Sequence, residues 1–332
     1  MRIWYDAGTG KQIRYGAAIA KALRKRDHQV ILTTRRHQDT LQVAEALKED
    51  FTPIGQYNPK TLMTRLKGGA RRQLALCKLF EKHEPDIAIS HGSVDLCRVA
   101  FGLGKPIITT ADTPYADAVH RLTLPLTRYI VASEAIPKNT LQHYNLDARV
   151  VPFNGVDEVA WIKNFKPTTE YSFGRPLIVF RQLEEKAAYA KDKPDSLALA
   201  KKLTKIGEVV FLSRYERKDI KGVIVPKSFV DSASLVAKAD LFVGVGGTIT
   251  REAALQGTPA IIINLFQQQY VNDLLIEQGF PIYKTDLQDV LKIAEKHIGK
   301  RKDVSRMLAN LENPVDTIVD IVDEVRRGHE KA

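Results

Sequence analysis

The sequence predicts an α/β protein with two Rossmann-like, doubly wound parallel-sheet domains that face a cleft, because three features agree. Short apolar segments alternate with segments of helical periodicity along the whole chain. A polar stretch without periodicity, residues 163–175, separates two such series. The length of 332 residues also exceeds that of one typical domain. We therefore expect an N-terminal domain over 1–162, a linker over 163–175 and a C-terminal domain over 176–332, with the last helix able to cross back to the first domain.

Each expected element follows from its hydrophobic period, which is two for strands and 3.6 for helices. In the first half we expect strands at 1–5, 29–34, 86–90, 106–110 and 129–132, and helices at 11–25, 40–48 and 60–83, the last broken at Gly68 and Gly69. In the second half we expect strands at 177–180, 209–212, 223–225, 241–245 and 260–263, and helices at 195–203, 232–239, 250–256, 270–278, 287–297 and 315–327. Ligands of such sheets bind beyond the carboxyl ends of the strands, so the loops there should carry the chemistry.

Charge is distributed unevenly along the chain. The formal net charge is +11, and residues 1–80 hold 16 Lys or Arg against 6 Asp or Glu. Such a basic region attracts phosphates on a substrate, a lipid surface or a nucleic acid. No apolar run reaches the roughly 18 residues that a membrane span needs. We expect a cytoplasmic protein, with a peripheral place at the inner face of the membrane as an alternative.

A glycine turn in the second half is the most informative segment. Gly246 and Gly247 follow an apolar strand and precede a helix that begins near Thr248. A helix start offers free N–H groups and the positive end of the dipole, which suits a diphosphate. Glu252, expected in the first helical turn, can accept hydrogen bonds from ribose hydroxyls.

A glutamine run follows the next expected strand. The amides of Gln267, Gln268 and Gln269 can read sugar hydroxyls, and Asn272 comes one turn later. Taken alone, this run is equally typical of a polar helix start without a ligand.

Together, the two segments resemble the nucleotide-sugar site of GT-B glycosyltransferases, in particular the bacterial N-acetylglucosaminyltransferases that make the last lipid-linked peptidoglycan precursor. That family has a glutamate six residues after the first glycine of its turn, as in Gly246 and Glu252, and a downstream QQYxNxL motif, as in QQYVNDL at 268–274. The resemblance implies that Gly247 and Thr248 hold diphosphate, that Glu252 holds ribose, and that Gln268 and Gln269 hold the sugar.

The same family has a GTGGH turn after its first strand. Gly8, Thr9 and Gly10 match that turn and are candidates for an acceptor or phosphate loop, whereas Lys11 and Gln12 replace its last glycine and its histidine. Lys11 can contact an acceptor phosphate as a point charge. Glutamine does not titrate, so a general base must come from another residue.

Four residues are candidates for that acid or base: Asp6, His91, Asp112 and His120. Asp112 could instead only open a turn before a proline. No DxD-type metal motif is present, so we expect metal-independent catalysis in which the main task is to stabilise the leaving diphosphate. Arg181 is a candidate to assist, since a guanidinium fork suits a phosphate.

The helix expected at 60–83 combines cations with leucines. Such segments can lie on anionic lipid, although a solvated helix that covers its own core is the more common case. The residues concerned are Arg65, Lys67, Arg71 and Arg72 beside Leu62, Leu66 and Leu74.

Other segments resemble the UDP-N-acetylglucosamine 2-epimerases of the same superfamily. Their HGDT turn corresponds to 91–94, where Ser93 replaces the aspartate, and their HRxEN turn corresponds to 180–184, where Phe180 replaces the histidine. Epimerase chemistry removes and returns a proton, so these losses count against it.

The whole chain resembles an uncharacterised, largely archaeal family of GT-B-like proteins. The shared features are a DxP at 112–114, HRLTLP at 120–125 and the loop GGTITREAALQGTPA at 246–260. This resemblance supports the fold and implies no activity.

We therefore expect a glycosyltransferase-like enzyme that binds a nucleotide-diphosphate sugar, with UDP as the usual nucleotide of the family. A phosphorylated or lipid-linked acceptor would fit the basic first half. No cofactor beyond the nucleotide-sugar substrate and no specific nucleic acid are expected. The alternatives are an epimerase-like enzyme and a catalytically degenerate nucleotide-sugar-binding protein. A dehydrogenase is disfavoured, because Ile13 stands where GxGxxG needs its third glycine.

Overall fold

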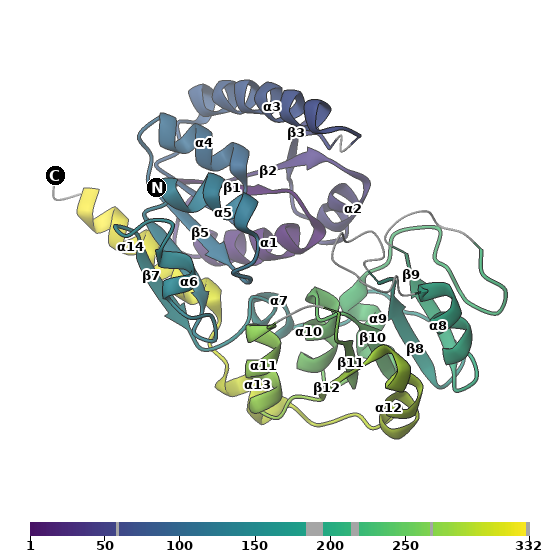
Figure 1. The fold of residues 1–332 in the computed structure, drawn as a ribbon. Coiled ribbons are helices and arrows are strands. Elements are labelled where there is room, and N and C mark those ends of the chain that lie inside the picture. Colours follow the sequence, from purple (N-terminus) through teal and green to yellow (C-terminus); the bar gives the residue numbers. More distant parts are fainter. Residues whose placement is uncertain (58–59, 184–194, 214–218, 266–267, 330–332) are drawn as a thin grey trace. The chain divides into compact units, whose positions relative to one another are not determined.

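The computed structural model describes residues 1–57, 60–183, 195–213, 219–265 and 268–329 and consists of two compact α/β units (Figure 1). Unit 1 comprises Met1–Trp161 together with Glu312–Ala332, and unit 2 comprises Ile162–Leu311. Each unit is built on one parallel sheet, which confirms the predicted fold class. None of the helices in the described ranges combines the length and the apolar character that a membrane crossing requires.

The sheet of unit 1 has the strand order β3-β2-β1-β4-β5-β6-β7. Its winding starts at β1, proceeds outward to β3, and then returns to β4 on the other side of β1. The strands are β1 (Arg2–Ala7), β2 (Gln29–Arg36), β3 (Thr52–Gln56), β4 (Ile87–Ser90), β5 (Ile107–Ala111), β6 (Tyr129–Ser133) and β7 (Arg149–Phe153).

The reversal of winding distributes the helices over both faces of this sheet (Figure 1). The helix α1 packs against α2 and α14, whereas α3 packs against α4, and α4 against α5. The helices of unit 1 are α1 (Gly10–Arg24), α2 (Gln38–Ala46), α3 (Leu62–His83), α4 (Val94–Gly102), α5 (Asp117–Thr123), η1 (Leu124–Leu126), α6 (Asn139–Gln142), α7 (Val159–Ile162, at the boundary with unit 2) and α14 (Pro314–His329).

The sheet of unit 2 has the order β12-β11-β10-β8-β9, so its winding reverses between β8 and β10. Its strands are β8 (Leu177–Arg181), β9 (Glu208–Leu212), β10 (Leu241–Gly244), β11 (Ala260–Ile263) and β12 (Ile282–Thr285). Its helices are α8 (Ser196–Leu203), α9 (Ser232–Lys238), α10 (Thr248–Leu255), α11 (Tyr270–Glu277), η2 (Leu287–Asp289), α12 (Val290–His297) and α13 (Ser305–Asn310).

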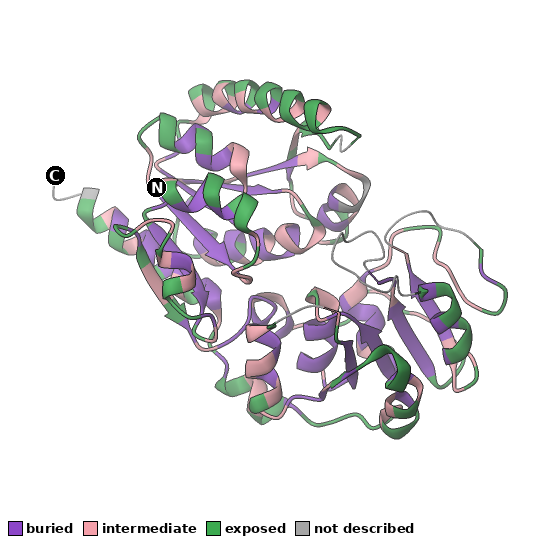
Figure 2. Ribbon diagram, in the orientation of Figure 1, coloured by how far each residue is buried: buried purple, intermediate pink, exposed green. Residues whose placement is uncertain are grey.

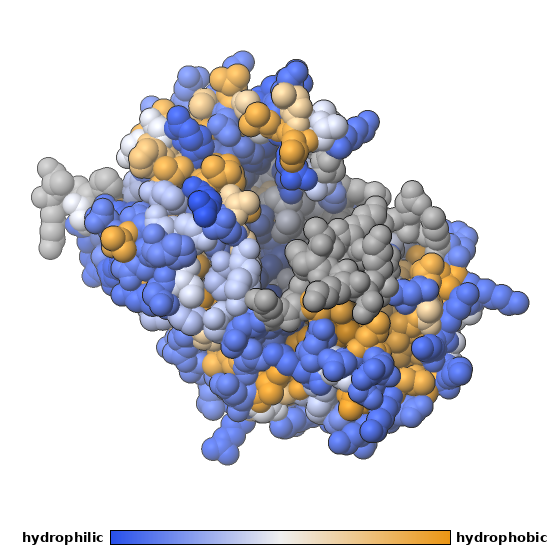
Figure 3. Space-filling view, in the orientation of Figure 1, coloured by the Kyte–Doolittle hydropathy of each residue, from blue (hydrophilic) through white to orange (hydrophobic). Residues whose placement is uncertain are grey.

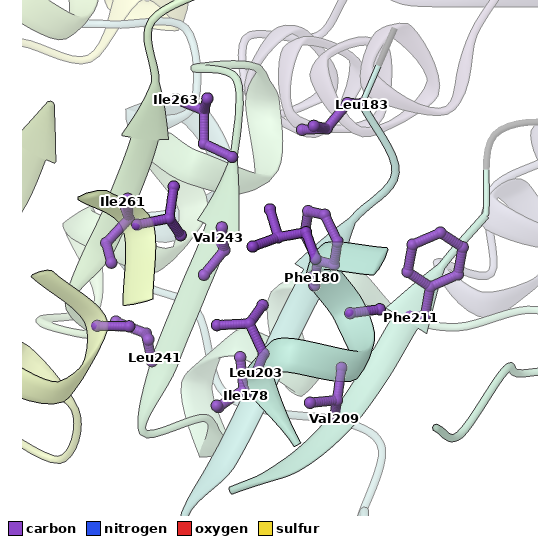
Figure 4. Close-up of a cluster of buried hydrophobic side chains, with 14 of the residues drawn as sticks. Ile178, Phe180, Leu183, Leu203, Val209, Phe211, Leu241, Val243, Ile261 and Ile263 are labelled. Carbon is purple, nitrogen blue, oxygen red and sulfur yellow. The ribbon is translucent and has the colours of Figure 1, made fainter. Parts of the chain in front are cut away.

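Apolar strands form the core of each unit, and the central strands of both sheets are buried in Figure 2, whereas the edge strands β3 and β7 are partly exposed. In unit 2, alternate residues of β8, β10 and β11 meet side chains of α8, as Figure 4 shows for Phe180, Val243 and Leu203. These parallel strands are covered on both faces, which explains why they are continuous apolar runs in the sequence.

Several element boundaries differ from the sequence-based expectation. The strands β3, β7 and β12 were missed, and all three are sheet edges. Residues 223–225 form only isolated bridges instead of a strand. The helix α3 is unbroken at Gly68 and Gly69, and α10 begins at Thr248 rather than at residue 250.

The last helix, α14, belongs to unit 1. It packs on α1, β6 and β7, and Glu324 accepts two hydrogen bonds from Arg149, at 2.9 and 2.8 Å. Residues 163–175 contain no helix or strand and belong to unit 2, where Thr168 N–H donates to Ser234 Oγ at 3.1 Å.

A buried ion pair joins the inner side of α3 to the end of β1. Arg72 donates to Asp6 at 2.6 and 3.0 Å and to Asp95 at 3.1 Å. Asp6 is 1% exposed and also accepts from Thr33 at 2.7 Å and from Ser93 at 2.5 Å. Burial alone would lower the pKa of Arg72, but Asp6 and Asp95 raise that pKa above its ordinary value.

This ion pair revises two expectations. Asp6 is shielded and paired with a guanidinium, which argues against Asp6 as the general base. Arg72 is buried, so it does not belong to the expected cationic docking face of α3. At the HGDT-like turn, Ser93 binds the Asp6 carboxylate, so the residue has a structural role where the epimerases have an acid.

The Arg72 pair can be tested against its exposed neighbour. Arg72→Gln should lower the free energy of unfolding by about 3–5 kcal/mol, because Asp6 remains buried with its main cation removed. Arg71→Gln is the matched control, since Arg71 is exposed and should change stability by less than about 0.5 kcal/mol. Urea unfolding followed by circular dichroism measures both, and equal midpoints would contradict the structural role.

Helical glycines provide a second test of packing. A Cβ on Gly16 of α1 would lie 2.3 Å from the Tyr5 ring, and the Tyr5 hydroxyl is itself fixed by donation to Gln12 O at 2.9 Å. Gly16→Ala should therefore cost about 1–3 kcal/mol of stability. Gly68→Ala, in open space on α3, should add about 0.5–1 kcal/mol. Urea unfolding measures the stability of both variants. A Gly16→Ala variant as stable as the parent would show that the Tyr5 ring can move to make room for the added methyl group.

Candidate functional site

Two loops meet where the winding of unit 1 reverses, between β1 and β4. Gln12 joins them: its Oε1 accepts from Gly8 N–H at 2.5 Å, and its Nε2 donates to His91 O at 2.7 Å. Thr9 caps α1 by accepting from Gln12 N–H at 3.3 Å, and Arg35 donates to Gly8 O at 3.1 Å. Gln12 thus fixes the shape of the loop over residues 8–10.

Lys11 lies among carboxylates instead of facing an open phosphate site. Its Nζ is 2.5 Å from Asp112, 2.8 Å from Asp157 and 3.8 Å from Glu158, and its side chain is only 12% exposed. Its charge is therefore offset within unit 1, which argues against a lysine available to an acceptor phosphate. Asp157 and Glu158 were missed by sequence reasoning, because they follow the unrecognised edge strand β7.

His91 and Asp112, both predicted from sequence, come together at this edge of the sheet. His91 Nδ1 lies 2.6 Å from Thr110 Oγ1 and 3.7 Å from Asp157, and its Nε2 lies 3.5 Å from Asp112. Which of these nitrogens carries the proton depends on the tautomer. We call the set Lys11, His91, Asp112, Asp157 and Glu158 the switch-point cluster.

Three members of this cluster have the geometry of metal ligands. One ligand atom from each of His91, Asp112 and Asp157 lies within 4.8 Å of the others. The Lys11 ammonium, however, is within 2.8 Å of both carboxylates and already supplies the positive charge that a cation would bring. Metal-independent chemistry therefore stays our prediction.

His120 lies near the cluster on α5. It is 5% exposed, its ring packs edge-on against Tyr144 at 5.5 Å, and its Nδ1 has no hydrogen-bond partner among the described residues. Burial lowers the pKa of His120, and the nearby Asp112 carboxylate opposes that shift only in part. The imidazole is therefore neutral at pH 7 and is suited to accept a proton rather than to donate one.

The glycine turn of unit 2 is in contact with the glutamine segment. Gly246 has φ +89°, and a Cβ there would lie 1.8 Å from Gln269 Oε1, so only glycine fits. Gln269 Nε2 donates to Val245 O at 3.2 Å, and Asn272 Nδ2 donates to Gly246 O at 2.8 Å. Arg251, which sequence reasoning did not single out, also donates to Gly246 O at 3.1 Å.

The start of α10 has the features of an anion site. Gly247 is the N-cap, and no side chain caps the helix, so the first N–H groups are not occupied by a capping side chain. The helix dipole adds a positive partial charge at the same point. Thr248 is the first helical residue and brings a hydroxyl to this end of the helix.

The other predicted sugar-site residues differ in accessibility. Glu252 lies in the second helical turn, is fully buried, and accepts from Ser232 Oγ at 2.7 Å. Gln269 is used to hold the glycine turn, whereas Gln268 is exposed. Gln267 lies outside the described residues.

Arg181 ends β8, on the opposite side of the winding reversal from Gly246. Its Nη1 donates to Ser213 O at 3.2 Å, and it is half-buried. Phe180, where the epimerases have a histidine, is fully buried in the core of unit 2 (Figure 4). Glu184 lies outside the described residues.

The chain is similar in sequence to one archaeal protein and similar in fold to several solved structures. The protein MJ0665 of Methanocaldococcus jannaschii is 29% identical over 96% of this chain and 97% of its own length. The UDP-GlcNAc 2-epimerase of the same organism, solved with UDP-GlcNAc and UDP, has a TM-score of 0.71 at 16% identity, covering 98% of this chain and 100% of that one. The glycotransferase of kitacinnamycin has a TM-score of 0.63 at 12% identity, covering 97% and 98%.

These structural similarities establish the fold that glycosyltransferases and UDP-sugar epimerases share, and at such low identity they establish no activity. A family model described as "Protein of unknown function (DUF354)" matches residues 1–327, nearly the whole chain. The protein therefore belongs to the DUF354 family.

Proposed function

We propose that the protein binds a nucleoside diphosphate sugar, with UDP as the nucleotide, on unit 2 and transfers the sugar to an acceptor. The observation that carries this proposal is the glycine turn before α10, a helix start without a side-chain cap that Gln269 and Asn272 hold in place. It lies at the carboxyl edge of the sheet next to the reversal of winding, where ligands of such sheets bind.

The diphosphate would lie at the N–H groups of Gly247 and Thr248. Gly246 has no side chain in the way, and its carbonyl is turned aside by bonds from Arg251 and Asn272. Carbonyl oxygens repel an anion, so this arrangement leaves the N–H groups and the dipole to face it. Arg181, across the reversal, is proposed as a second phosphate contact.

Glu252 and Gln268 would recognise the ribose and the sugar. A carboxylate has capacity for about four hydrogen bonds, so the bond from Ser232 does not by itself prevent Glu252 from binding a hydroxyl. Because Glu252 is fully buried, a ribose hydroxyl must either take the place of the Ser232 hydroxyl at the Glu252 carboxylate or bind to the Ser232 hydroxyl itself.

In the transfer step, an acceptor oxygen attacks the anomeric carbon of the sugar. The carbon–oxygen bond to the diphosphate breaks, and the nucleoside diphosphate leaves with the electron pair. The acceptor proton passes to a general base, for which Asp112, His91 and His120 stay the candidates. The Lys11 ammonium, 2.5 Å from Asp112, would hold that carboxylate in position.

An epimerase-like reaction is the second candidate, and the switch-point cluster is the observation that favours it. Ser93 and Phe180 have structural roles. His91, Asp112 and Asp157, however, supply ionisable groups that lie together at the carboxyl edge of the unit 1 sheet. Removal and return of the sugar C2 proton needs such groups. Incubation with UDP-GlcNAc in heavy water would place deuterium at C2 in an epimerase and leave C2 unlabelled in a transferase.

Donor binding gives a charge-matched test. We expect calorimetry to detect UDP and UDP-GlcNAc binding, and Glu252→Gln to weaken it about 10- to 100-fold, since a hydrogen bond to a charged group is worth about 1.5–3 kcal/mol. Glu277→Gln changes an exposed residue at the C-terminal end of α11, and this variant should bind UDP as the parent does. Unchanged binding in a folded Glu252→Gln variant would remove Glu252 from the site, and no nucleotide binding at all would refute the proposal.

The roles of the cluster residues can be separated from binding. Asp112→Asn and His91→Gln should leave UDP affinity unchanged but slow release of UDP from UDP-GlcNAc, measured with a lipid extract as acceptor, by about 10²- to 10⁴-fold, the usual worth of a general acid or base. Asp147→Asn, an exposed change in the loop between α6 and β7, is the control. If both variants turn over UDP-GlcNAc as fast as the parent, Asp112 and His91 have no catalytic role. If the parent binds UDP-GlcNAc but does not turn it over, the protein is instead a catalytically degenerate nucleotide-sugar-binding protein.

A further inference from the structure

Exposed apolar side chains are concentrated on one group of helices in unit 1. Among the described residues, thirteen large hydrophobic side chains are exposed, and nine of them lie on α3 or in the segments from α4 to α5. Of these thirteen, two belong to the described part of unit 2, Leu197 and Leu287. The nine are Leu62, Met63, Leu66, Leu74, Phe101, Leu103, Tyr115, Val119 and Leu122.

The helix α3 carries the most exposed part of this set. Leu62, Leu66 and Leu74 are 80%, 70% and 70% exposed, and exposed Ala70 completes a row at i, i+4, i+8 and i+12. Residues at this spacing lie on one side of a helix. Figure 2 shows α3 as largely exposed, and Figure 3 shows apolar side chains at the surface in its region.

Cations accompany this apolar row, and the one acidic residue of α3, the exposed Glu81, lies near the C-terminal end of the helix, beyond Leu74. Residues 51–80 contain no Asp or Glu, and Arg65, Lys67, Arg71 and Lys78 are all exposed. Arg72, the cation that points inward, is the one paired with Asp6. The outer side of α3 is therefore both apolar and positively charged.

We propose that α3 docks on the surface of an anionic lipid bilayer, with its leucines at the headgroup boundary and its cations on lipid phosphates. This combination of an apolar row and flanking Lys or Arg is what interfacial helices use. A nucleic acid would satisfy the cations but offers no apolar phase for three exposed leucines. A second copy of the chain would bring two sets of cations together, which like-charge repulsion opposes.

The helix is already formed and fixed before it meets a membrane. Thr61 and Thr64 form a capping box at its start, with reciprocal bonds of 3.1 and 2.9 Å. On its inner side, Arg72 and Leu76 are buried against the rest of unit 1. Docking therefore needs no ordering of the chain, and the proposal stands independently of the proposed donor site.

Vesicle sedimentation of the full chain without nucleotide tests the proposal. The protein should bind vesicles that contain phosphatidylglycerol and not vesicles of phosphatidylcholine alone. Binding to the anionic vesicles should weaken as salt is raised from about 0.05 M to about 0.5 M, because the Debye length shortens. Lys67→Gln with Arg71→Gln should lower the partition coefficient by about fivefold for each charge removed.

A matched pair of triple variants isolates the apolar contribution. Leu62→Gln, Leu66→Gln and Leu74→Gln together should lower binding at least about tenfold, since interfacial binding scales with buried apolar area. Leu146→Gln, Leu197→Gln and Leu287→Gln change three exposed leucines elsewhere and should bind as the parent does. All positions are exposed, so the fold should persist, and thermal unfolding checks this.

Two results would overturn the proposal. One is that the parent fails to bind anionic vesicles at low salt. An acidic protein would then be the better candidate for the partner of α3. The other is that the folded α3 triple variant binds as tightly as the parent, which would show that attraction is electrostatic only and not specific to this helix.

Discussion

The reversal of winding in each parallel sheet is the constraint on which the rest of the structure depends. In unit 1 it falls between β1 and β4, and in unit 2 between β8 and β10. Helices that leave the two central strands go to opposite faces, so the loops above those strands separate and leave room for a ligand. In each unit, the candidate binding and acid–base residues lie at this point or beside it.

Side-chain amides hold these loops in both units. Gln12 links Gly8 to His91 in unit 1, while Gln269 and Asn272 bind the turn at Gly246 in unit 2. An amide offers both a donor and an acceptor and does not titrate, so it fixes backbone shape at any ordinary pH. Two arginines support the same loops, since Arg35 donates to Gly8 O and Arg251 donates to Gly246 O. The Asp6–Arg72 ion pair lies inside unit 1 and joins the end of β1 to α3.

Central strands and glycine turns could be predicted from the sequence, because burial on both faces makes a strand apolar throughout and a positive φ requires glycine. The edge strands β3, β7 and β12 could not, since an edge strand is partly solvated and tolerates proline, as Pro53 and Pro152 illustrate. Missing β7 also concealed Asp157. The pairing of Lys11 was beyond prediction, because its partners Asp112 and Asp157 are more than 100 residues away.

The proposed membrane-docking face on α3 and the proposed donor turn before α10 belong to different units, and they have separate tests. The donor site is the central claim, and hydrogen–deuterium exchange of the full chain with and without UDP tests it most directly. The account predicts that UDP slows exchange of amides within residues 246–252 and 268–272 and leaves α3 unchanged. Protection confined to residues 8–12 or 91–93, or no protection at saturating UDP, would contradict the assignment of the nucleotide to unit 2.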